Sequence, residues 1–162
     1  GFMQTFPENG AHGVTVQDDA VEGVDFGNRR ARRGAVHGTK WSDENGNGRR
    51  ERGEPGLHGV IIFSDLNDNG ELDGGEPRTR TRRDRRGTNV DEAGSYALKG
   101  LAPGRHVIRE VVPDGFRQTF PSGPDATIPG GHVVTVTGAV VHDLNFGNRR
   151  TGRALIGRKR LR

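Results

Sequence analysis

The sequence from residue 65 to residue 76 places oxygen-bearing side chains at fixed intervals around a glycine, and it reads Asp65-Leu66-Asn67-Asp68-Asn69-Gly70-Glu71-Leu72-Asp73-Gly74-Gly75-Glu76. Oxygen side chains stand at positions 1, 3, 5, 9 and 12 and glycine stands at position 6, which is the pattern of a calcium-binding loop. A large hard cation binds about six to eight oxygens, and the tight turn needs a residue that tolerates positive φ. We therefore expect this segment to bind calcium.

A second copy of the pattern lies upstream, from residue 43 to residue 54, and a proline follows each copy directly. We call residues 43–54 the first loop and residues 65–76 the second loop. The expected side-chain ligands are Asp43, Asn45, Asn47, Glu51 and Glu54 in the first loop, and Asp65, Asn67, Asn69, Asp73 and Glu76 in the second. The backbone carbonyls of Arg49 and Glu71 occupy position 7. Solvated turns are the alternative, since Asn, Asp and Gly also favour ordinary tight turns.

The charges around the two loops differ. The first loop contains Arg49, Arg50 and Arg52, whereas the second contains the extra acids Asp68 and Glu71 and no base. Positive charge near a cation weakens its binding. We therefore expect the second loop to bind calcium more tightly than the first.

The composition favours short strands joined by turns. The 162 residues include 27 Gly and 8 Pro, and only 30% are hydrophobic. Apolar and polar residues alternate in short runs that predict strands over 35–41, 58–65, 88–91, 95–99, 105–112, 116–120, 132–137 and 140–147. This pattern predicts an all-β fold, an antiparallel β-sandwich. The expected core residues are Trp41, Ile62, Tyr96, Leu98, Leu101, Ile108, Phe116 and Phe146. The chain has no cysteine, and bound metal is another way to fasten a small core.

The first 30 residues are repeated later in the chain. Three segments (1–7, 14–16 and 24–30) match residues 115–121, 134–136 and 144–150 at an offset of 114 to 120 residues. A period of this length indicates tandem domains. We therefore expect residues 1–30 to be the last strands of a preceding, truncated repeat, 31–34 a linker and 35–148 a complete repeat. Residues 149–162 form a basic tail in which 154–159 resemble 35–40, as at the start of a degenerate next repeat.

The positive charge of the chain is concentrated in a few segments of the sequence. The net charge is +4, yet residues 35–148 contain 14 basic and 16 acidic side chains. The basic residues gather in the run 78–87 and in the flanks 29–33 and 149–162. No aromatic residue accompanies the run, although single-strand binders stack bases on aromatic rings. We therefore expect no specific nucleic-acid binding.

The complete repeat resembles a known family over nearly all of residues 36–148. The segments that carry the resemblance are Trp41-Ser42-Asp43, Gly53-Glu54-Pro55-Gly56-Leu57, Gly75-Glu76-Pro77, Leu101-Ala102-Pro103-Gly104, Glu110-Val111-Val112-Pro113 and Gln118-Thr119-Phe120-Pro121. They look like the B-type repeat domain of bacterial serine-aspartate-repeat surface adhesins and, more loosely, the B-type domains of the collagen adhesin. The resemblance implies a prealbumin-like (Ig-like) sandwich in a tandem array stiffened by two Ca²⁺ ions. The arginine-rich run departs from the family, and we expect it to form a mobile loop.

These observations predict a non-enzymatic spacer or stalk in a secreted or cell-surface, adhesin-like protein. Neighbouring repeats of the same chain are its expected partners. The alternative is a binding module that contacts an extracellular protein, a polysaccharide or an anionic polymer through its surface and the run 78–87. No apolar stretch is long enough to cross a membrane. No signal peptide opens the chain, and because it starts inside a repeat we expect any signal upstream.

Other site chemistries find little support. The six histidines are scattered without the pairing that zinc requires, and no catalytic motif is present. The resemblance to collagen-adhesin domains raises the question of an amide bond between Lys40 and Asn145 or Asn148, promoted by Glu110. A surface lysine and a capping asparagine would explain the same residues.

Overall fold

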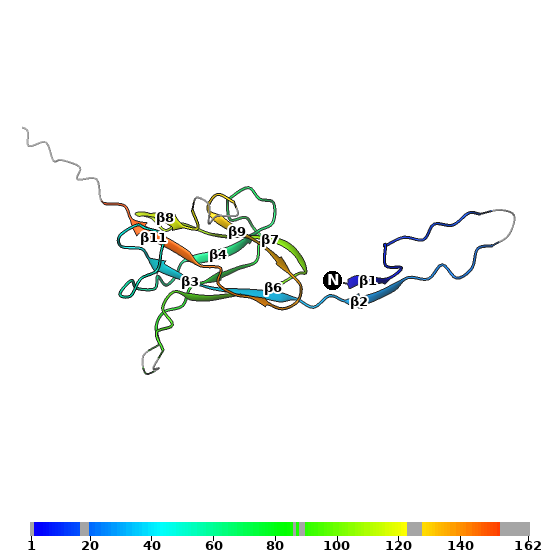
Figure 1. Ribbon diagram of the computed structural model, residues 1–162, viewed down its shortest axis with the longest axis horizontal. Coiled ribbons are helices and arrows are strands. Elements are labelled where there is room, and N and C mark those ends of the chain that lie inside the picture. Colours follow the sequence, from blue (N-terminus) through cyan, green and yellow to red (C-terminus); the bar gives the residue numbers. More distant parts are fainter. Residues whose placement is uncertain (1, 17–19, 86, 88–89, 123–127, 153–162) are drawn as a thin grey trace, which may run out of the picture.

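The computed structural model describes residues 2–16, 20–85, 87, 90–122 and 128–152. All regular structure in these residues is β-strand (Figure 1), and they contain no helix able to span a membrane. The strands are β1 (Phe2–Phe6), β2 (Gly27–Arg30), β3 (Gly34–Ser42), β4 (Ile61–Asp65), β5 (Arg78–Arg80), β6 (Ser95–Leu101), β7 (Gly104–Glu110), β8 (Phe116–Phe120), β9 (Gly131–Val136), β10 (Val140–Val141) and β11 (Phe146–Arg150).

Strands β3 to β11 form two sheets. One has the order β10-β3-β11-β8 with β6 also paired to β3, and the other has the order β5-β4-β7-β9. Every pair in the second sheet is antiparallel. In the first sheet β10 and β11 run parallel to β3, so the prediction of a wholly antiparallel sandwich was wrong on this point. The all-β prediction is confirmed.

The core lies between the two sheets. Its cluster takes side chains such as Val36, Leu98 and Phe146 from the first sheet and Ile62 and Ile108 from the second. Seven of the eight predicted core residues are buried, and Phe116 is the exception, at intermediate exposure. The guanidinium of Arg150 lies over the Phe116 ring, 5.2 Å from its centre. Phe116 therefore packs against an arginine at the surface and not against the core.

Several strand boundaries differ from the predictions. The segment 58–65 is a strand only from Ile61, and 140–147 divides into β10 and the start of β11. Asp143 lies between them with a φ of 64°, a left-handed conformation that interrupts a strand. The predicted strand 88–91 lies partly outside the described residues, and Val90 and Asp91 are not in a strand.

The arginine-rich run begins as a strand, so the prediction of a mobile loop over 78–87 was wrong for its first residues. Arg78, Thr79 and Arg80 pair with β4. Thr81 is buried, and its hydroxyl donates to the Leu57 carbonyl at 2.6 Å. The exposed arginine side chains thus alternate with threonines that face inward, as period-2 strands require.

The first 30 residues form a separate antiparallel pair, β1 with β2, to one side of the sandwich (Figure 1). The register repeats that of β8 with β11. The matching pairs are Phe2↔Arg30 with Phe116↔Arg150, Met3↔Arg29 with Arg117↔Arg149, and Gln4↔Asn28 with Gln118↔Asn148. The surroundings differ, since Phe26 is 57% exposed while its counterpart Phe146 is 0% exposed. This agreement supports the interpretation of residues 1–30 as strands of an incomplete repeat, which stays a prediction.

Candidate functional site

The two loops share most of their internal hydrogen bonds. Each leaves a strand of the sandwich at its first residue, Asp43 directly after β3 and Asp65 at the end of β4. In both, the carboxylate at position 1 accepts from the N–H groups of positions 5 and 6. The Asn oxygen at position 3 accepts from N–H 5, and that at position 5 accepts from N–H 7. These bonds wrap the backbone around the side-chain oxygens.

The glutamate at position 12 closes each loop. Glu54 accepts from the N–H groups of Glu44 and Glu51 at 3.0 and 3.1 Å. Glu76 makes the equivalent bonds with Leu66 and Asp73 at 2.7 and 3.0 Å. Position 12 is therefore held beside positions 2 and 9 in both loops, as closure of a ligand shell requires.

The position-9 carboxylates meet the asparagine amides. Asn47 Nδ2 donates to Glu51 at 2.6 Å, and Asn67 and Asn69 donate to Asp73 at 2.8 Å. The side chains predicted as ligands are thus linked by hydrogen bonds within each loop, and their carboxylate and amide oxygens, with the position-7 carbonyl, are the donor types that suit calcium. Within the described part of the chain no three His, Cys, Asp or Glu side chains form a metal-binding group by themselves. Any ion here would depend on the asparagines and the position-7 carbonyl as well.

The neighbourhoods of the loops differ in a way the sequence did not predict. The second loop contains no base of its own, but Arg109 reaches it from β7. Arg109 Nε donates to Asp65 Oδ2 at 2.8 Å, and Nη2 donates to Asp68 Oδ1 at 2.9 Å. Burial opposes ionisation of Asp65, but hydrogen bonds from Gly70 and Arg109 outweigh it and lower the pKa of its carboxyl.

A second cluster of polar side chains lies inside the sandwich, where Lys40 of β3, Glu110 of β7 and Asn148 of β11 meet. Lys40 Nζ is 3.1 Å from Glu110 Oε2, and Asn148 Nδ2 donates to the same oxygen at 3.1 Å. Lys40 and Asn148 are 0% exposed, so the interpretation of Lys40 as a surface residue was wrong. The cluster joins the two sheets.

Burial governs the ionisation of this cluster. It lowers the pKa of Lys40 to about 8, although Glu110 acts in the opposite direction. It raises the pKa of Glu110 to about 6, against the effect of Lys40 and Asn148. Both shifts favour the neutral forms, an amine and a carboxylic acid. The Asn148 Oδ1 atom is buried and finds no hydrogen-bond partner among the residues that the structure describes.

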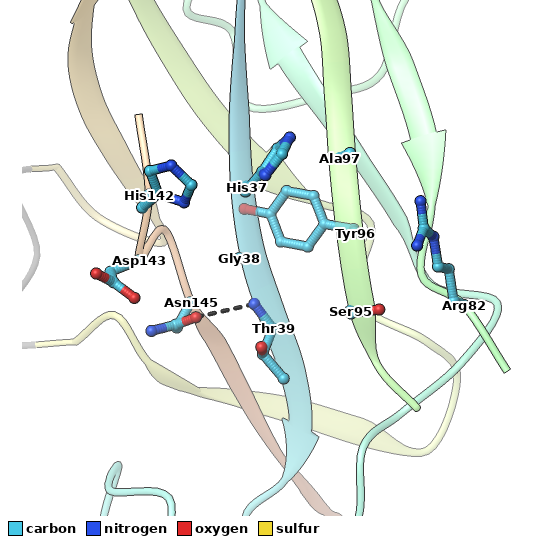
Figure 2. Close-up of a pocket in the computed structure, with 10 residues that line it drawn as sticks. All are labelled: His37, Gly38, Thr39, Arg82, Ser95, Tyr96, Ala97, His142, Asp143 and Asn145. Atoms are coloured by element: carbon cyan, nitrogen blue, oxygen red, sulfur yellow. Dashed lines mark hydrogen bonds between the residues drawn. The ribbon is translucent and has the colours of Figure 1, made fainter. Parts of the chain in front are cut away.

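The cluster and the first loop are neighbours. The N–H of Asp43 donates to the carbonyl of Asn148 at 2.8 Å, so the first ligand of the loop is fixed to the strand that carries the asparagine. Asn145 lies elsewhere, because its Oδ1 accepts from the Thr39 N–H at 2.8 Å in the pocket shown in Figure 2. Of the two asparagines proposed as partners of Lys40, the structure places only Asn148 in the cluster.

The pocket of Figure 2 is an open depression on the outer surface of the first sheet. The rings of His37 and His142 pack edge to face, with centres 5.3 Å apart. Burial, followed by the charge of His142, lowers the pKa of His37. Among the described residues no third His, Cys, Asp or Glu side chain joins these two rings in a metal-binding group. The pocket is lined by His37, Gly38, Thr39, Arg82, Ser95, Tyr96, Ala97, His142, Asp143 and Asn145.

The chain resembles parts of several known proteins. Colossin-A of Dictyostelium discoideum is 32% identical over 84 residues, which is 48% of this chain and 1% of Colossin-A. No family model matches the chain. Similar solved structures include GBS52, the minor pilin of Streptococcus agalactiae, with a TM-score of 0.43 and 16% identity over 74% of this chain and 45% of the pilin.

Two further solved structures are major pilin subunits. BcpA of Bacillus cereus has a TM-score of 0.42 and 16% identity over 79% of this chain and 35% of its own. SpaD of Corynebacterium diphtheriae has a TM-score of 0.37 and 16% identity over 75% of this chain and 34% of its own. The chain therefore spans less than half the length of each of these four proteins. None of these matches singles out the serine-aspartate-repeat type.

Proposed function

We propose that this chain is a non-enzymatic structural module, a spacer or stalk in a secreted or cell-surface, adhesin-like protein, whose sandwich is stiffened by calcium. The observation that carries the proposal is the set of eight side-chain hydrogen bonds that the two loops have in common, position for position. Unrelated solvated turns would not share so many side-chain contacts in one register. Two stabilising loops in one domain are more useful to a structural repeat that bears mechanical load than to an enzyme.

Each loop begins where a strand of the sandwich ends, so an ion bound there would hold the loop against the sheets. The first loop begins at the end of β3, next to β11, and the second begins at the end of β4, next to β7. Asp43 and Asp65 are both buried, and each is fixed by N–H donors before any ion arrives. Calcium would supply the positive charge that draws the carboxylates of each loop together. The backbone of each loop is already hydrogen-bonded at its first residue to a neighbouring strand, so an ion bound in the loop would be linked to the sheet.

Calcium titration by calorimetry tests the proposal. We expect the full chain to take up two calcium ions at millimolar concentrations, because extracellular modules of this ligand type have dissociation constants of roughly 10⁻⁴ to 10⁻³ M. Asp43→Ala and Asp65→Ala should each remove one site. A matched control is Asp114→Ala, which alters an exposed carboxylate outside both loops. Absence of calcium uptake by the unmodified chain would contradict the proposal.

The buried cluster favours a second fastener, an amide bond between Lys40 and Asn148. In this reaction Lys40 passes a proton to Glu110, its neutral amine attacks Cγ of Asn148, the Cγ–Nδ2 bond breaks and ammonia leaves. Glu110 lies within reach of both nitrogen atoms, so it can take a proton from the amine and pass one to the leaving nitrogen. The bond would join β3 to β11 inside the core. It would serve the same structural function as the calcium loops.

A further inference from the structure

The guanidinium of Arg109 is held by three hydrogen bonds, two of them to the second loop. Its Nε and Nη2 atoms donate to Asp65 and Asp68, and its Nη1 atom donates to the Pro129 carbonyl at 2.7 Å. Its side chain is only 14% exposed, and that of Asp65 is 0% exposed. Charge-assisted bonds of this kind are strong when they are shielded from water. The guanidinium is therefore a fixed part of the loop environment.

The backbone of Asp68 supports this interpretation. Position 4 is a glycine in the first loop, Gly46 with φ of 80°, whereas it is Asp68 with φ of 57° in the second. A residue with a side chain is strained in this left-handed conformation. The Asp68 carboxylate contacts Arg109 at 2.9 Å and Arg105 at 3.6 Å. The acid thus occupies a position that favours glycine, and its ion pairs offset the strain.

Within the described residues no cation pairs with a carboxylate of the first loop, although the side chains of Arg149 and Arg117 lie beside Gly46. Asp43 accepts from the neutral N–H groups of Gly46, Asn47 and Gly48. Within the described ranges, every ion pair that touches a loop carboxylate belongs to the second loop. The two loops therefore share their internal hydrogen bonds but differ in the charge that faces ligand position 1.

We propose that Arg109 is a resident counter-cation of the second loop. In the absence of calcium its guanidinium neutralises Asp65 and Asp68 and holds the loop closed, and it lowers the calcium affinity of this loop below the value its acids alone would give. The inference rests on the proposed calcium binding. It explains how the second loop can stay closed when calcium is scarce.

The test is calcium titration in an Asp43→Ala background, which leaves only the second loop able to bind. Adding Arg109→Gln removes the positive charge, and we expect the second loop to bind calcium about tenfold more tightly. Arg109→Lys keeps the charge and should stay close to the background affinity. Arg105→Gln is the matched control on the same strand, because Arg105 contacts Asp68 but not Asp65, and it should change the affinity by less than about threefold.

A second measurement reports on the calcium-free state. In chelator, Arg109→Gln should lower the melting temperature, since the buried Asp65 carboxylate loses its partner, and calcium should then restore more stability than it adds to the unmodified chain. Unchanged or weaker calcium binding by Arg109→Gln would overturn the inference even if the first loop binds calcium normally. Failure of the unmodified chain to bind calcium at either loop would instead reject the proposed function.

Discussion

Lys40 and Glu110 form an ion pair in the core, with Asn148 bonded to the same carboxylate oxygen. Taking a lysine and a glutamate out of water is costly, and their mutual attraction only partly offsets the cost. Apolar side chains of similar size would fill the same space without that cost. A polar cluster that joins three strands and both sheets therefore needs a reason beyond packing, and formation of an amide bond is such a reason, because it removes both the amine and the amide NH₂ from the interior.

Intact-mass measurement of the full chain tests this bond. We expect the unmodified protein to be lighter than its sequence by the mass of one ammonia. Asn148→Ala removes the acceptor and should show the full sequence mass. Asn145→Ala is the control, since Asn145 bonds to the Thr39 N–H outside the cluster, and it should retain the loss. An unshifted mass for the unmodified chain would exclude the bond.

At this scale the sequence predicts best what is close together along the chain. The proposed loop ligands follow one another within twelve positions, so spacing alone is enough to propose them. Arg109 is 44 residues from Asp65, and Glu110 is 70 residues from Lys40. Those contacts depend on strand pairing, which spacing does not reveal. The choice between Asn145 and Asn148 likewise depends on the register of β11 against β3.

The pair β1 and β2 has the sequence of two sandwich strands but lacks the packing of a sandwich. Its residues repeat those of β8 and β11, yet Phe2 and Phe6 are 70% and 51% exposed. In the sandwich the corresponding strands have β3 as a third partner and lie over a core. A two-stranded ribbon without such support is marginally stable in water.

Amide hydrogen exchange compares the two copies directly. We expect the N–H groups of β2 to exchange much faster than the matching N–H groups of β11, although their pairing register is the same. The reason is that β2 opens by local fraying, whereas β11 opens only when the sandwich unfolds. Protection of β2 equal to that of β11 would contradict the interpretation of residues 1–30 as an incomplete repeat.

Strand prediction succeeded where alternation and turn residues coincided and failed where charge hid the pattern. β6, β7, β8 and β9 lie within about two residues of their predicted bounds. β5 was missed because arginines fill its exposed positions and threonines its inner ones, so no apolar residue marks the strand. The parallel pairing of β10 and β11 with β3 was also missed, since a long connection separates these strands and local sequence carries no signal for it.

The whole molecule has few means of stabilisation. Only 30% of its residues are hydrophobic and it has no cysteine, while ordering the long loops between the strands costs conformational entropy. An ion present at about ten times its dissociation constant adds about 1.4 kcal/mol per site. Two sites would contribute about 3 kcal/mol, a substantial part of the roughly 5–15 kcal/mol that keeps a domain folded.

Thermal unfolding of the full chain, once with millimolar calcium and once with excess chelator, tests the central claim most directly. A gain of about 3 kcal/mol in a domain of this size should raise the melting temperature by about 10 °C, and the variant that combines Asp43→Ala with Asp65→Ala should lose most of this gain. Magnesium should substitute poorly, because it requires a compact octahedron and keeps its waters. Equal melting temperatures in calcium and in chelator would contradict the account of a calcium-stiffened module.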